Sequence, residues 1–153
     1  MLPDPFKQSL AIVADTYNPI LLLISLFICV QIWKQGYPLY IIRLAGAAFA
    51  VYSIMFMDLW LGIWQYAGLD YSTHTATSLA MIIFISQNKS IKIKIALGVS
   101  LLIYGAIMKF LNYHTWGDMI TTGMVIALMV NLVDKIIVKF LPSRYRNELS
   151  PRS

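Results

Sequence analysis

The sequence predicts an all-α protein, a polytopic transmembrane bundle of about five helices. Of its 153 residues, 59% are hydrophobic and only 12% are charged, which is about half the charge content of an ordinary soluble domain. The hydrophobic residues stand in long blocks, as transmembrane helices require, rather than in short alternating runs. One compact membrane domain is therefore expected, without a separate soluble domain.

Five apolar blocks mark the expected spans, and aromatic residues flank their ends, as is usual at the level of the lipid headgroups. A helix needs about 20 apolar residues to cross a bilayer, so the third block is short for a full span. The spans are expected at residues 17–34, 39–66, 72–86, 91–112 and 117–140. Residues 1–16 are expected to form an interfacial segment, 17–141 the transmembrane domain, and 142–153 a cytoplasmic polar tail.

The basic residues indicate how the bundle is oriented. In a five-span arrangement only Lys7 and Lys109 lie on one side, and the other ten basic residues lie on the opposite side. Positive charge collects on the inner side of membrane proteins, which predicts an outer N-terminus and an inner C-terminus. The net charge of +5 is thereby explained without a nucleic-acid partner. The ten residues are Lys34, Arg43, Lys89, Lys92, Lys94, Lys135, Lys139, Arg144, Arg146 and Arg152.

The sequence contains two histidines, His74 and His114, and both lie where an inward-running helix is expected to begin. Their separation of 40 positions corresponds to a helical hairpin, which returns the chain to the same membrane level. Both imidazoles are therefore expected on the outer face. His114 and Asp118 are four positions apart, so on a helix the carboxylate would orient the imidazole and His74 would provide a second one.

Two short segments resemble motifs of the type-2 phosphatidic acid phosphatase superfamily, including its sphingomyelin synthase-like branch. Ser72-Thr-His-Thr75 resembles the Ser-Gly-His-Thr core of the second motif, and Tyr113-His-Thr-Trp-Gly-Asp118 resembles the end of the third. The resemblance covers roughly residues 55–135. It implies that His114 attacks phosphorus to form a phosphohistidine, that Asp118 orients it, and that His74 protonates the leaving oxygen.

Five residues are expected to bind the substrate. The resemblance implies that Ser72 donates to a phosphate oxygen, whereas Lys109, one position after Met108 where the family has an arginine, is expected to supply one cationic contact. Asp58, within the second span, is expected to pair with Lys109 or to face the histidines. The full expected set is Ser72, Thr73, Lys109, Asp58 and Tyr113. The sequence also departs from the family, because the first motif is absent and no basic residue occurs between Arg43 and Lys89.

Three functions remain open from the sequence. The first is a lipid phosphatase or phosphotransferase without a cofactor, acting at the outer leaflet of what is expected to be a bacterial inner membrane. The second is a metal-dependent hydrolase that binds zinc or a similar ion through His74, His114, Asp118 and Asp70, or Asp58 in place of Asp70. The third is a non-enzymatic membrane subunit or lipid-binding protein with a decayed site. Membrane lipids are the expected partners, while the particular lipid, the acceptor and the oligomeric state stay open.

Overall fold

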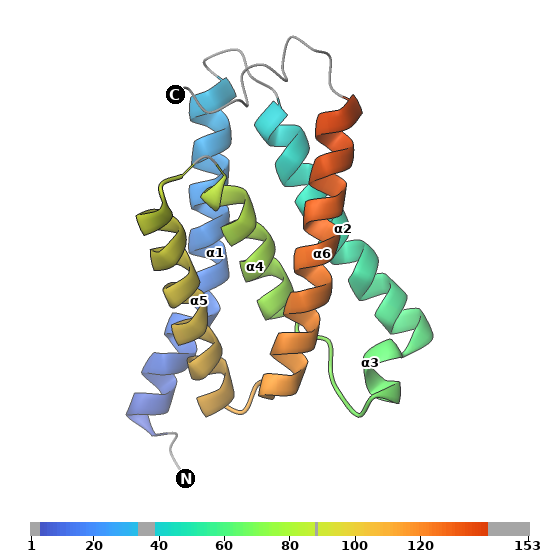
Figure 1. The fold of residues 1–153 in the computed structure, drawn as a ribbon. Coiled ribbons are helices and arrows are strands. Elements are labelled where there is room, and N and C mark those ends of the chain that lie inside the picture. The colour runs from blue at the N-terminus through green and yellow to red at the C-terminus, as the bar shows by residue number, and fades with distance from the viewer. Residues whose placement is uncertain (1–3, 34–38, 88, 141–153) are drawn as a thin grey trace.

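The computed structural model describes residues 4–33, 39–87 and 89–140, and within these ranges every regular element is a helix (Figure 1). The all-α prediction is therefore confirmed. The bounds of each expected span are reproduced to within a few residues, except where a helix is extended or interrupted. The helices are α1 (Pro5–Trp33), α2 (Leu39–Leu61), α3 (Ile63–Tyr66), α4 (Thr73–Ser86), α5 (Ile91–Phe110) and α6 (Trp116–Phe140).

The four helices α1, α2, α5 and α6 are long and apolar enough to cross a membrane. Figure 1 shows that α1 begins at one end of the bundle and α6 finishes at the other. Large apolar side chains such as Leu23, Phe49, Leu102 and Leu128 are exposed on the outer surfaces of these helices. A hydrophobic exterior of this kind fits an integral membrane protein, whose outer side chains face lipid.

The short helix α4 lies in the middle of the bundle and packs against α1, α2, α5 and α6 (Figure 1). Eight of its 14 residues are buried, a larger share than in any of the four long helices. At about 1.5 Å per residue it is only about 21 Å long, less than the thickness of the hydrocarbon core. Its neighbours shield it from lipid, which explains how a short helix is accommodated here.

The α2–α6 contact depends on a small residue and an ion pair. A Cβ atom added to Gly46 would lie 2.5 Å from Cδ1 of Ile137 and 3.0 Å from Cγ1 of Val133, so the helices approach closely there. Nearby, Arg43 donates from Nε to Oδ1 of Asp134 at 2.6 Å and from Nη2 to Oδ2 at 2.7 Å. These contacts join the two helices toward the end of the bundle that lies away from the histidines.

Two expected boundaries differ from the structure. Residues 5–16 are not a separate piece, because α1 continues from Pro5 into the first expected span without a break. The second expected span, residues 39–66, is interrupted at Gly62, whose φ of +60° separates α2 from the single-turn helix α3. The expected tail at 142–153 lies outside the described residues.

Candidate functional site

The start of α4 is fixed by Ser72, which caps the helix and also connects it to α6. The hydroxyl of Ser72 accepts a hydrogen bond from the backbone N–H of Thr75 at 3.3 Å and donates to Oγ1 of Thr75 at 2.9 Å. The backbone N–H of Ser72 donates to Oγ1 of Thr122 at 3.1 Å. Ser72 is fully buried, so its hydroxyl completes a cap and is not displayed for the phosphate contact that the family resemblance implies.

The turn between α5 and α6 is built from two adjacent caps. Asn112 adopts a positive φ of 58° and donates from its N–H to the carbonyl of Lys109, while Tyr113 donates to the carbonyl of Met108. This is the Schellman pattern that ends a helix. Two residues later, Thr115 and Asp118 exchange hydrogen bonds in the manner of a capping box that begins α6.

These two caps hold His114 opposite His74. The ring centroids of the two imidazoles are 6.3 Å apart with an interplanar angle of 56°. Nδ1 of His74 lies 3.3 Å from the hydroxyl oxygen of Tyr104, a buried residue of α5. The structure therefore brings the two imidazoles together at one end of the bundle.

Asp118 occupies this end as well, but it does not form the expected hydrogen bond with His114. Oδ1 of Asp118 accepts from the backbone N–H of Asp70 at 2.9 Å, and Oδ2 accepts from the N–H of Thr115 at 2.7 Å. The i, i+4 argument fails because His114 precedes the first residue of α6, Trp116, and so does not share a helical face with Asp118. The structure assigns Asp118 to capping and to fastening the Asp70 loop.

The carboxylate that faces His114 belongs to Asp70, whose Oδ2 lies 3.8 Å from Nδ1 of His114. The side chain of His114 is 11% exposed and that of Asp70 is 73% exposed. Nδ1 of His114 is buried and has no hydrogen-bond partner among the described residues. Burial lowers the pKa of His114 below its ordinary value of 6.5, and Asp70 and Asp118 offset this only in part. Burial therefore favours the neutral imidazole.

The remaining residues of the expected substrate-binding set are placed in different ways. Thr73, Tyr113 and Lys109 are exposed at the histidine end of the bundle. Oδ1 of Asp58 accepts a hydrogen bond from the backbone N–H of Trp64 at 2.9 Å, which holds the turn at Gly62. Among the described residues no ion pair joins Asp58 and Lys109, because the Asp58 carboxylate is engaged within its own turn.

The expected metal alternative is not supported by side-chain placement. Within residues 4–33, 39–87 and 89–140, no group of three or more His, Cys, Asp or Glu side chains is arranged to hold a metal ion. Two of the four expected ligands, Asp118 and Asp70, have carboxylates in different surroundings. Asp118 binds backbone N–H groups through both oxygens, whereas Asp70 is largely exposed.

Three polar residues around His74 lie outside the set of site residues expected from the sequence. Asn18 of α1 donates from Nδ2 to the carbonyl of His74 at 3.3 Å, and its Oδ1 accepts from the hydroxyl of Ser78 at 2.6 Å. Tyr104 contacts the His74 ring as described above. The signal that could have found them is a polar side chain inside an apolar block, since such groups normally face the bundle interior.

Comparison with known proteins identifies no relative. No family model, no curated protein and no solved structure matches the chain. The fold and site thus define a helical bundle that fits an integral membrane protein, with paired histidines at one end.

Proposed function

We propose that the protein is a membrane phosphoester hydrolase or phosphotransferase that acts on lipid phosphates at the histidine end of the bundle. The observation that carries the proposal is the pairing of His74 and His114, whose ring centroids are 6.3 Å apart. This spacing leaves room for a phosphoryl group between one imidazole that attacks and another that donates a proton. The short motifs around both histidines, which resemble those of lipid phosphatases, support the same chemistry.

In the proposed reaction a ring nitrogen of His114 forms a bond to phosphorus and the bond from phosphorus to the lipid alcohol breaks. His74 gives its proton to the departing alkoxide. Water then attacks the phosphohistidine and releases inorganic phosphate, or a second alcohol accepts the phosphoryl group. Burial favours the neutral form of His114, which suits the residue to the attack because only an unprotonated nitrogen has a free electron pair.

Asp70 takes the orienting role that the sequence resemblance implies for Asp118. Its carboxylate faces Nδ1 of His114 at 3.8 Å, and we expect this distance to shorten when substrate binds. Contacts of catalytic groups are often longer without substrate than with it. A proton held on Nδ1 leaves Nε2 of His114 as the attacking atom.

The location of the site on the outer side of a bacterial inner membrane is part of the same proposal. It is supported by the basic residues of the sequence, because counting five spans predicts ten of the twelve on the side opposite the histidines. With this orientation the histidines face the periplasm or the exterior, and the substrate is a lipid of the outer leaflet.

The test uses the purified full chain in lipid vesicles with phosphatidic acid labelled in its phosphate group. We expect release of inorganic phosphate, or a new phospholipid when an alcohol acceptor is supplied, and an acid-labile label on the protein. The His114→Ala variant should lose both the label and turnover. The turnover rate of His74→Ala should fall by at least about 100-fold. Asn131→Ala, an exposed position on α6 away from the histidines, is the matched control.

The proposal fails if a panel of lipid phosphates and phosphodiesters gives neither turnover nor a labelled protein. It also fails if turnover persists in His114→Ala at the level of the Asn131→Ala control. Those results favour the non-enzymatic alternative.

A further inference from the structure

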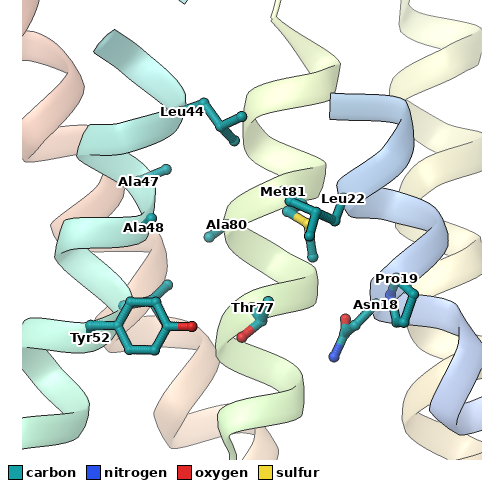
Figure 2. A pocket seen from close by; sticks show the side chains of 11 residues that line it. Asn18, Pro19, Leu22, Leu44, Ala47, Ala48, Tyr52, Thr77, Ala80 and Met81 are labelled. Atoms are coloured by element: carbon teal, nitrogen blue, oxygen red, sulfur yellow. The ribbon is translucent and has the colours of Figure 1, made fainter. Parts of the chain in front are cut away.

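A largely apolar pocket of about 370 Å³ lies between α1, α2 and α4 (Figure 2). Apolar side chains form most of its wall, among them Leu22, Leu44 and Met81. Its polar members are Asn18, Tyr52 and Thr77, one from each of the three helices. A pocket with this lining accepts a hydrocarbon chain. Its polar residues favour a chain that carries a hydrogen-bonding group.

Two hydroxyl groups in this pocket have no hydrogen-bond partner among the residues that the structure describes. Figure 2 shows the hydroxyls of Tyr52 and Thr77 pointing toward each other from α2 and α4. Neither forms a hydrogen bond with another described residue. Threonines in helices commonly donate to a carbonyl in the preceding turn, as Thr16 and Thr121 do here. Tyr52 is 57% exposed and Thr77 is half-buried, so in a membrane both hydroxyls meet lipid, where an unpaired hydroxyl is unfavourable. An acceptor on the occupant of the pocket would satisfy them.

The pocket is also linked to the histidine end. Asn18 lines it and holds the carbonyl of His74 through Nδ2. Thr77 is three residues beyond His74 on α4, which is about 4.5 Å along the helix axis. In a glycerolipid the ester carbonyls lie one glycerol unit away from the phosphate, a separation of similar size.

We infer that this pocket binds an ester-linked acyl chain of a glycerolipid, with the ester carbonyl accepting hydrogen bonds from Tyr52 and Thr77. The chain then extends along Leu44 and Met81, away from the histidines. The inference rests on the proposed function, since that function places the lipid phosphate beside His74. Binding of the acyl chain, however, is measurable in the absence of any reaction.

The test is a competition between dioleoylglycerol and its diether analogue, which has the same chains but lacks both carbonyls. Neither molecule carries a phosphate, so the result does not depend on turnover. The purified full chain is mixed with equal amounts of the two lipids in detergent, and the bound ratio is read by native mass spectrometry. We expect the diester to be enriched about fivefold, as one or two net hydrogen bonds imply.

The variants Tyr52→Phe and Thr77→Val remove only the hydroxyl, and each should lower the enrichment toward one. Thr77→Ser keeps the hydroxyl and should keep the diester enrichment. This variant therefore separates loss of the hydroxyl from misfolding. Tyr66→Phe and Thr16→Val, at exposed positions outside the pocket, are the matched controls. Equal binding of the two lipids by the wild type overturns the inference, as does an enrichment that survives in both Tyr52→Phe and Thr77→Val. If the diester preference is found but phosphatidic acid is not turned over, the acyl-chain site stands and the proposed function fails.

Discussion

Oδ1 of Asp118 lies 2.9 Å from the backbone nitrogen of Asp70, so one carboxylate fastens the loop before α4 to the start of α6. Its other oxygen caps α6 through Thr115. A residue that the sequence suggests as a catalytic partner is therefore part of the framework. Asp70, the exposed residue that it fastens, presents its own carboxylate to His114.

The two aspartates are expected to behave differently when neutralised. Asp118→Ala removes a buried carboxylate and leaves the backbone N–H groups of Asp70 and Thr115 without their acceptor, which should lower the free energy of unfolding by about 1–3 kcal/mol. Asp70→Asn keeps the backbone N–H and alters a side chain that is 73% exposed, so its effect should stay within about 0.5 kcal/mol. Thermal unfolding in detergent measures both. Equal stability of the two variants would contradict the framework role of Asp118.

The protonation of His114 predicts how stability depends on pH. Its pKa is below 6.5 in the folded protein because burial disfavours the charged ring. The unfolded chain, with a pKa near 6.5, binds the proton first as the pH falls. The contribution of His114 to stability is therefore complete above about pH 6.5 and is lost as the pH falls toward the folded pKa.

His114→Gln should flatten this part of the stability profile, and Asp70→Asn should lower the pKa of His114 further, because the Asp70 charge raises it. Unfolding measured between pH 5 and pH 8, with NMR titration of the two histidines, provides the readouts. A pKa of His114 that rises in Asp70→Asn would show that the two side chains do not interact as described.

Close packing of α2 against α6 leads to a prediction at Gly46. A leucine there has no space, because even a Cβ atom would meet Ile137 and Val133, and Gly46→Leu should cost about 1–3 kcal/mol. Gly98 is the matched control on α5, since a Cβ atom added there meets nothing within 4 Å. Gly98→Ala should be neutral or slightly stabilising. Similar melting temperatures for Gly46→Leu and Gly98→Ala would argue against a tight α2–α6 contact.

The sequence predicts the helices of this protein better than the roles of its polar side chains. The lengths of the apolar blocks predict the helices, and the spacing of His74 and His114 predicts that both histidines lie at one end of the bundle, because both follow from the fixed rise of a helix. The roles of individual polar groups were not predictable. The spacing of His114 and Asp118 suggests one helical face only if both residues are helical, and the capping box formed by Thr115 places His114 outside α6.

The sequence alone does not determine whether Arg43 and Asp134 form an ion pair or reach the membrane surface separately. In the structure the two side chains form a bidentate pair and are only 9% and 23% exposed. Removal of one partner leaves the other charge in an apolar environment. Arg43→Leu and Asp134→Leu should therefore each cost about 3–5 kcal/mol.

Removal of both partners leaves no unpaired charge, so the double variant should be markedly more stable than the sum of the two single losses predicts. A double-mutant cycle on thermal unfolding measures this coupling, which we expect at about 1–3 kcal/mol. Asn131→Ala, an exposed position one turn away on α6, provides the baseline. Additive losses would mean that each side chain reaches the membrane surface independently, and that the close α2–α6 contact relies on Gly46 and its apolar neighbours alone.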